Sequence, residues 1–374
     1  MDVAVHAVLA APHGPVAQSR YLASRTLWAS APTPEESFLA TLRSTAKRMG
    51  RPAVLLPMDD ITAIYIARHS AILTPDFLVS APAADVPARV ADKHTLAATC
   101  AEHGIPHPEI RVIENAADVS AAPFGYPLMA KWARPWLSTG EHGFRSTMVV
   151  RTPADLAAVA DLAALEPGEL LLQRHLAPRP DADWFFHGYF RDGSCVFSGT
   201  GRKERAYPPT AGITTLGRWL PNPEIDETAR TLAKALGYSG VLDLDFRYDP
   251  RDGRHYLLDF NPRVGAQFRL FGDTGGMDVI RAAYLDLAGE PLDVGAPHYD
   301  RTYLVENYDL LRKLMRARGT NSGKGRGWLA SLRQADELAW YASDDFEPFV
   351  GMVKHTFLRA LKGRRKQPPR RPHD

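Results

Sequence analysis

Polar and apolar residues alternate along two short stretches in the middle of the chain, residues 241–248 and 255–263. They read V-L-D-L-D-F-R-Y and H-Y-L-L-D-F-N-P-R, and a period of two is typical of strands with two unlike faces. The segment D-P-R-D-G between them has the Pro and Gly of a tight turn. The two stretches therefore predict an antiparallel hairpin, whose apolar face is expected to hold Leu242, Leu244, Phe246, Tyr248, Tyr256, Leu258 and Phe260.

The other face of this hairpin carries Asp243, Asp245, Asp259 and Asn261. A turn centred on Asp252 places Asp245 directly opposite Asp259, where Cβ atoms lie roughly 4.5–5.5 Å apart and like charges destabilise the pair. Two carboxylates and an amide on one face favour a bound cation, and oxygen ligands suit Mg²⁺ bridged to phosphates. We expect a metal at Asp245, Asp259 and Asn261, with Asp243 beside it or as an extra ligand. The simpler alternative is a half-exposed edge with solvated acids.

The first 88 residues mix short apolar strands with helical patterns. Strands are predicted over residues 3–9 and 53–56, and a helix over 33–49 with Thr33 as N-cap and Pro34 in the first turn. Strands that alternate with helices imply a parallel sheet. A stretch rich in Ala, Pro and Asp at 79–87 predicts a linker. We therefore expect an N-terminal α/β domain over residues 1–88.

A second domain is expected over residues 89–290. It begins with a helix that opens near Asp92 and ends at Gly104. The further predicted elements are strands at 128–132, 148–151, 170–174, 184–190 and 195–200 and helices at 153–165, 224–236 and 277–288. Residues 291–374 form a C-terminal extension that ends in LKGRRKQPPRRPHD. Such basic tails are usually solvated and disordered, although binding to acidic partners or membrane surfaces is an alternative.

Composition narrows the class of protein. A chain of 374 residues suggests two or three domains, and 45 basic against 43 acidic side chains give no indication of a nucleic-acid partner. Two distant cysteines, Cys100 and Cys195, argue against a zinc site or a disulfide framework. No apolar run approaches the ~20 residues that span a bilayer, and the N-terminus lacks the basic start of a signal peptide. We expect a cytoplasmic protein without a membrane or nucleic-acid partner.

The order of these motifs resembles a known family. A D-K helix ending in G-I-P-x-P is followed by a lysine-bearing strand (P-L-M-A-K-W), a loop of small residues at 138–143, a strand L-L-L-Q-R-H-L and the acidic hairpin ending in D-F-N-P-R. Over residues 89–290 this order resembles the ATP-grasp superfamily, and within it the stand-alone amino-acid ligases that include D-aspartate ligase.

The resemblance implies a fold of mixed α/β and α+β class. It is an ATP-grasp domain preceded by a Rossmann-like domain, which in this chain is apparently shortened at its start. A missing first strand would expose a sheet edge that a homodimer could cover.

The resemblance also implies roles for individual residues. Lys93 and Lys131 would contact the ATP phosphates, since an ammonium group is a compact point charge. The other nucleotide contacts would come from the loop residues Ser138, Thr139 and Gly140, the adenine hinge Gln173, Arg174, His175 and Leu176, and Asp183 at the ribose, with Asp181 as second choice. Arg263, Lys203 and Arg205 would act on the transferred phosphate and the acyl group. Family members usually carry a glutamate in the hinge, where this chain has Arg174 followed by His175. This difference affects the prediction of how the hinge recognises the edge of the adenine.

The expected activity is that of an ATP-dependent carboxylate–amine ligase that works through an acyl phosphate. Its cofactors would be ATP and Mg²⁺, or Mn²⁺ in its place, and its partners a small-molecule carboxylate and amine. Two alternatives remain open at this point. One is a carboxylase or carbamoyl-type enzyme that uses bicarbonate, and the other is an ATP-binding regulator without turnover.

Overall fold

The computed structural model describes residues 3–28, 33–113, 124–137, 147–163, 169–208, 212–318 and 328–365. Residues 1–52 and 304–374 cluster as one compact unit and residues 53–303 as another. The domain boundaries expected near residues 88 and 290 remain predictions. The loop residues Ser138, Thr139 and Gly140 lie outside the described residues.

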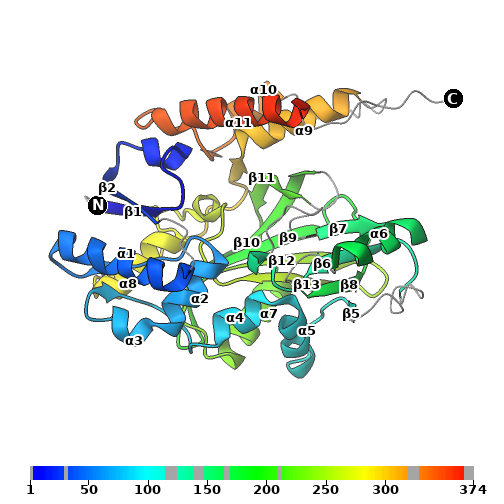
Figure 1. The fold of residues 1–374 in the computed structure, drawn as a ribbon, viewed down its shortest axis with the longest axis horizontal. Helices are drawn as coiled ribbons and strands as arrows, with labels where there is room; N and C mark the ends of the chain where they lie inside the picture. The colour runs from blue at the N-terminus through cyan, green and yellow to red at the C-terminus, as the bar shows by residue number, and fades with distance from the viewer. Residues whose placement is uncertain are drawn as a thin grey trace. The chain divides into compact units, whose positions relative to one another are not determined.

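The first unit contains a short parallel strand pair and several helices (Figure 1). Strand β1 (Val5–Leu9) pairs in parallel with β2 (Leu22–Leu27). Helix α1 (Pro34–Met49) starts with proline, as predicted, but the side chain of Thr33 makes no capping hydrogen bond. The remaining elements are η1 (Pro15–Gln18), α9 (Glu306–Arg318), α10 (Trp328–Gln334), β15 (Glu337–Leu338) and α11 (Glu347–Arg365). Nowhere in the described part of the chain is there a helix long and apolar enough to cross a membrane.

The second unit begins with a second parallel pair, β3 (Ala53–Val54) with β4 (Phe77–Leu78). Two helices lie between these strands in the sequence, α2 (Asp60–Arg68) and α3 (Ser70–Leu73). Helix α4 (Val86–Ala91) follows the second strand. The strands of the N-terminal region therefore pair in parallel, as expected, but they form two separate two-stranded sheets.

A four-stranded antiparallel sheet follows helix α5 (Lys93–Glu102), which Asp92 caps by accepting from the backbone N–H groups of His94 and Thr95. The strands are β5 (Ile110–Ile113), β8 (Leu170–Arg174), β6 (Leu128–Trp132) and β7 (Thr147–Val150), in that spatial order. Even-numbered side chains, such as those of Ala130 and Leu172, pack with helix α6 (Pro153–Ala163). Strand alternation therefore turns Lys131 and Gln173 to the other face.

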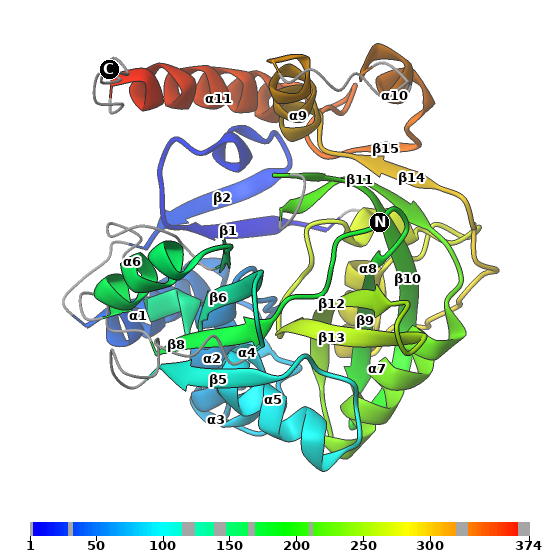
Figure 2. The same ribbon diagram turned by 90° about the vertical axis from the view of Figure 1, so that its right-hand side faces the viewer.

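The larger sheet of this unit carries the acidic hairpin (Figure 2). Its strands are β13 (Arg254–Asn261), β12 (Gly240–Asp249), β9 (Asp183–Arg191), β10 (Ser194–Tyr207), β11 (Ile213–Trp219) and β14 (Thr302–Leu304), in spatial order. The first five strands are antiparallel to their neighbours. Helices α7 (Pro223–Ala235) and α8 (Val279–Ala288) contact this sheet, and short turns η3 (Pro135–Leu137) and η4 (Phe268–Phe271) complete the unit.

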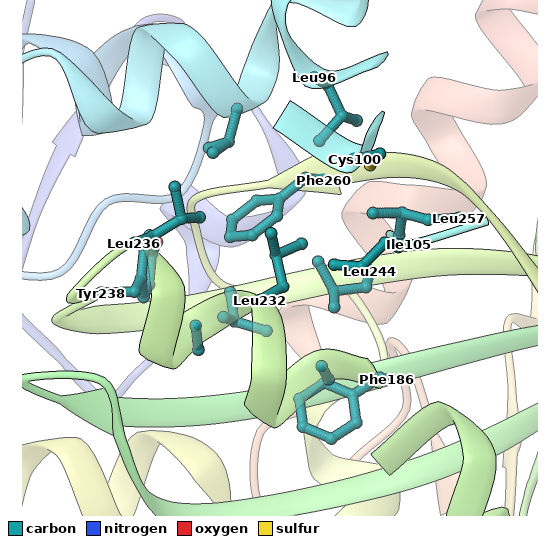
Figure 3. Packing of buried hydrophobic residues seen from close by; sticks show 14 of the residues in the cluster. Leu96, Cys100, Ile105, Phe186, Leu232, Leu236, Tyr238, Leu244, Leu257 and Phe260 are labelled. Carbon is teal, nitrogen blue, oxygen red and sulfur yellow. The ribbon is translucent and has the colours of Figure 1, made fainter. Parts of the chain in front are cut away.

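One face of the large sheet is filled by the main hydrophobic core (Figure 3). Leu244 and Phe260 from the hairpin and Phe186 from β9 pack there with Leu96 of α5 and Leu232 of α7, and all five are at most 3 % exposed. Each such side chain stabilises the fold by roughly 1.5–3 kcal/mol through removal from water. Because this face is committed to the core, the alternating acids must lie on the opposite face.

The hairpin register confirms the prediction at the acidic end and corrects it near the turn. Asp245 pairs with Asp259 and Asp243 with Asn261. A bulge beyond this point leaves Leu258 without a partner and pairs Phe246 with Leu257. Leu257 therefore packs in the core in place of Leu258.

The prediction that Leu258 and Tyr256 share the apolar face was wrong. The bulge shifts the later residues by one position. Tyr256 accordingly pairs with Arg247, on the face of the acids.

Candidate active site

The polar face of the hairpin meets a lysine from the neighbouring part of the same sheet. On β9 and β12, Phe185 lies beside Asp245 and His187 beside Asp243. Lys203 extends from β10 to bring Nζ within 2.6 Å of Oδ1 of Asp245. Because Gly199 and Gly201 have no side chains, the aromatic rings of Phe271 and Phe185 lie against β10 at those positions.

Asp259 is held by two lysines from outside the large sheet. Lys93 is the first residue of α5, and its Nζ donates to Oδ1 of Asp259. Nζ of Lys131, from β6, lies 3.5 Å from Oδ2 of Asp259 and 3.4 Å from the carbonyl oxygen of Leu258. The bulged residue thus supplies a second acceptor to a lysine that is only 5 % exposed.

The lysines and the carboxylate shift one another's pKa values. Burial lowers the pKa of Lys131, because the charged form loses its water, and the negative charge of Asp259 opposes that shift. Burial by itself raises the pKa of Asp259, but the charges of Lys131 and Lys93 outweigh it and hold the pKa well below its usual range. Asp259 is therefore an anion whose charge is already neutralised.

Arg263 is fixed between two carboxylates just after the last strand of the hairpin. Its Nη1 lies 2.6 Å from Oδ2 of Asp243, and its Nε lies 3.7 Å from Oδ1 of Asp60, at the start of α2. The amide nitrogen of Asn261 donates to the carbonyl oxygen of Asp243 at 3.1 Å. The side chain of Asp243 therefore binds the arginine, and that of Asn261 is tied through its nitrogen.

The predicted metal ligands are brought together in a form that suits a hard cation. Asp245 and Asp259 are cross-strand neighbours, and Asn261 is on the same strand face as Asp259. With its nitrogen used by the backbone, Asn261 has its amide oxygen as the atom for a cation, and this donor set fits Mg²⁺. In the described part of the chain no group of three or more His, Cys, Asp or Glu side chains could hold a metal. The site of two carboxylates and one amide stays a prediction.

The expected nucleotide residues are found beside this site but with partners of their own. Arg247 holds the carboxylate of Asp183 through two contacts, of 2.6 and 3.1 Å, and donates to the carbonyl oxygen of Leu176 at 3.0 Å. Burial lowers the pKa of His175, and the positive charges of Arg247 and Arg151 lower it further. The roles of Gln173 to Leu176 and of Asp183 toward a nucleotide stay predictions.

The guanidinium group of Arg174, at the position where the resemblance implies a glutamate, takes part in a network at the end of the strands. Its Nε lies 2.7 Å from Glu109 and its Nη1 3.4 Å from Asp249, and it stacks over the ring of Tyr256 at 5.1 Å. The side chain thus links β8 to the hairpin, which leaves only its backbone for an adenine.

The catalytic candidates divide into two groups. Arg263 and Lys203 both contact the acidic face. Arg205 is farther along β10, opposite Leu216 of β11, and is half-buried. Glu204 lies between Lys203 and Arg205 in the sequence, and its Oε1 accepts a hydrogen bond from Nη2 of Arg202 at 2.7 Å.

Sequence reasoning missed three residues that border the site: Asp60, His107 and His187. Asp60 contacts Arg263, and His187 lies 3.2 Å from Asp243. Burial, with Lys131 nearby, lowers the pKa of His107 to about 4, so this imidazole is neutral near pH 7. A signal existed for His187, because it is a lone histidine within the apolar stretch W-F-F-H-G-Y-F.

Comparison with known proteins reveals distant relatives. No family model matches the chain. Over 295 residues the chain is 23% identical to D-aspartate ligase from Enterococcus faecium, a match that covers 74% of this chain and 68% of that enzyme. Over 195 residues it is 27% identical to biotin carboxylase from Allochromatium vinosum, which covers 49% of this chain. The match spans only 40% of the length of that carboxylase.

Solved structures show the same fold. An ADP complex of N5-carboxyaminoimidazole ribonucleotide synthetase matches with a TM-score of 0.60 at 13% identity and covers 97% of this chain and 92% of that chain. L-amino acid ligase from Bacillus licheniformis matches with a TM-score of 0.55 at 14% identity and covers 73% of this chain and 64% of that chain. The mixed α/β architecture is therefore shared with these enzymes over most of its length.

Proposed function

We propose that this chain is a distant member of the ATP-grasp superfamily, which its similarity to D-aspartate ligase and biotin carboxylase supports, and that it is an ATP-dependent ligase that joins a carboxylate to an amine. The observation that carries the proposal is the convergence of Lys93, Lys131 and Lys203 on the opposed carboxylates of Asp245 and Asp259. Cations and carboxylates in one place can hold a metal and the outer phosphates of a nucleotide together.

The proposed reaction has two steps. A carboxylate oxygen of the first substrate attacks the γ-phosphorus of ATP, the bond from that phosphorus to the β–γ bridging oxygen breaks, and ADP leaves. The amine nitrogen of the second substrate then attacks the acyl carbon. The carbon–oxygen bond to the phosphoryl group breaks, phosphate leaves with the electron pair, and the nitrogen loses a proton to solvent. The products are an amide, ADP and phosphate.

The residues of the site supply charge and position. Lys93 and Lys131 would turn from Asp259 to the phosphates, where an ammonium group offsets negative charge. Mg²⁺ or Mn²⁺ held by Asp245, Asp259 and Asn261 would neutralise the phosphate oxygens. Arg263 would bind the reacting carboxylate or acyl phosphate through its forked N–H groups. The prediction that residues 138–143, with Ser138, Thr139 and Gly140, exclude water from the acyl phosphate falls outside the described residues.

A second candidate function rests on the similarity to a biotin carboxylase. In that case bicarbonate would be the carboxylate that is phosphorylated. The regulator without turnover has a specific feature in its favour, since Arg174 replaces the usual hinge glutamate, but Lys93, Lys131 and Arg263 are all present in the site. We therefore rank the amide-forming ligase first, with small-molecule substrates in the cytoplasm. A homodimer remains a prediction.

The proposal is tested by supplying Mg-ATP and pools of amino acids or bicarbonate, followed by mass spectrometry and separate assays for ADP and AMP. ADP release that depends on an amino acid, with an amide product, is the expected result. Carboxylate oxygen labelled with ¹⁸O should appear once in the released phosphate. AMP as the product would overturn the acyl-phosphate mechanism, and ADP release that needs only bicarbonate would favour the carboxylase. Tight ATP binding with no turnover on any pair would favour the regulator.

A further inference from the structure

Arg263 is held in place through a chain of buried groups that reaches the centre of the large sheet. Its Nη1 binds Oδ2 of Asp243 at 2.6 Å, and the other oxygen of that carboxylate, Oδ1, lies 3.2 Å from Nε2 of His187. His187 is 1 % exposed and Asp243 7 % exposed. Each oxygen of this buried carboxylate therefore has a polar neighbour: Oδ2 accepts a hydrogen bond from Arg263, and Oδ1 faces the imidazole at 3.2 Å without the geometry of a hydrogen bond.

The imidazole of His187 is itself locked by its surroundings. The rings of Phe185 and Phe271 pack against it, with centroids 5.5 and 5.2 Å away. Gly265 lies directly beneath it, so close that a Cβ atom at that position would overlap the ring. This packing restricts how the imidazole can turn beside the carboxylate of Asp243.

We propose that His187 is a positioning residue for Arg263 and acts through Asp243; this inference rests on the proposed function. With Oδ1 facing the imidazole of His187, Asp243 presents Oδ2 to Arg263. The contact through Nη1 leaves Nη2 of the guanidinium for the substrate anion. Without the imidazole the carboxylate can rotate and accept from both Nη1 and Nη2, which removes the Nη2 donor from the substrate.

The other contacts of Arg263 show which of its nitrogens already have partners. Nη1 also donates to the carbonyl oxygen of Val264 at 3.1 Å, and Nε faces Asp60. Within the described part of the chain Nη2 has no such contact. The group left for a substrate anion is then Nη2, and its direction depends on how Asp243 binds Nη1.

The test compares His187→Gln with a matched packing variant, Phe271→Leu. Phe271 touches the same ring but does not contact Asp243 in the described structure, so its variant reports loss of packing alone. We expect His187→Gln to lower kcat for ADP formation by roughly 10–100-fold, the range typical of a residue that orients a functional group. The KM for ATP should change by less than about twofold, since only interactions in the transition state are lost. Phe271→Leu should keep kcat within about threefold, a change equivalent to less than ~1 kcal/mol.

A double-mutant cycle with Arg263→Lys decides whether the histidine acts through the arginine. If it does, His187→Gln should have little further effect on kcat once Arg263 is lysine. Fully additive losses, or equal losses in His187→Gln and Phe271→Leu, would overturn the inference.

A crystal structure of His187→Gln tests the arrangement without turnover. We expect Asp243 to bind Arg263 with both oxygens, and an unchanged end-on contact contradicts the inference. If the wild-type protein forms no ADP with any acid, the proposed function fails, and this structural result still reports on the positioning role.

Discussion

The ammonium group of Lys203 lies 2.6 Å from Oδ1 of Asp245, beside a carboxylate that is expected to bind a metal ion. Burial raises the pKa of Asp245, the charge of Lys203 opposes this, and the neighbouring Asp243 and Asp259 raise it further. The lysine thus stabilises an anion that would otherwise be unfavourable among like charges. If Asp245 is a metal ligand, the metal ion would displace this lysine, which could then turn to a phosphate.

We predict that metal and nucleotide bind together. Mn²⁺ alone should bind weakly to the wild-type protein, because Lys203 competes for Asp245, and ADP should strengthen its binding. Lys203→Met should tighten the binding of Mn²⁺ alone about tenfold, or ~1.4 kcal/mol, and should still lower ADP formation. Electron paramagnetic resonance titration measures free Mn²⁺ directly. The control is Lys234→Met, on the exposed face of α7. Weaker Mn²⁺ binding in Lys203→Met than in this control contradicts competition.

Asp259→Asn should lower ADP formation by at least ~10²-fold, the scale seen when one electrostatic group is removed from an active site. Asp259 is both a proposed metal ligand and the partner of Lys93 and Lys131. The amide can still accept from the lysines, so we expect the free energy of unfolding to fall by only about 1–3 kcal/mol. Steady-state ADP assays and urea denaturation measure the two effects, with Asp252→Asn in the hairpin turn as control. An active Asp259→Asn enzyme would remove Asp259 from the metal site.

Arg263→Lys should lower kcat by roughly 10²–10³-fold while ATP affinity changes much less. A lysine keeps the charge beside Asp243, but its single nitrogen lacks the planar, fixed set of donors with which a guanidinium can bind Asp243 and an anion together. Calorimetry of ATP binding without the second substrate provides the comparison. If nucleotide affinity falls as far as turnover does, Arg263 belongs to the ATP site.

The stability of the fold should fall in acid through Asp249, at the end of β12. Hydrogen bonds from Arg251 lower the pKa of Asp249 to about 2, and the charges of Arg251 and Arg174 add to this. In the unfolded chain an aspartate has a pKa of about 3.9. The pKa is depressed in the folded state, so the stabilisation is fully present above about pH 4 and is lost as the pH falls to about 2.

Urea denaturation between pH 2 and 6 measures this dependence. Asp249→Asn should flatten it in the window from about pH 4 to 2. Asp252→Asn, at the exposed turn of the same hairpin, serves as control. A variant with the same pH dependence as the wild type shows that Asp249 does not contribute.

The hairpin shows what the sequence could and could not reveal. Period-two alternation and the turn residues were enough to align Asp245 with Asp259, because each face has its own kind of side chain. The same pattern failed at Leu257 and Leu258, two identical neighbours of which only one can enter the core. Which of them enters depends on the packing of α5 and α7 against the sheet, and a local pattern does not contain that information.

The sequence pattern also could not predict which cationic side chains meet at the site. Lys93 and Lys131 come from different elements, and only the known order of motifs in related enzymes suggested that they meet. His187 and Asp60 carried no such motif, and their roles depend on which strands and helices are adjacent. Strands β9 and β12 are far apart in the sequence, and their pairing brings His187 to Asp243. No periodicity along either strand predicts this.

The contact between Gly265 and the ring of His187 restricts how these two positions can evolve. An alanine at 265 is incompatible with the present imidazole, whereas a smaller side chain at 187 would make room for it. Among natural homologues the two positions should therefore covary. Sequences that keep histidine at 187 should keep glycine at 265, and any larger residue at 265 should be accompanied by a smaller one at 187.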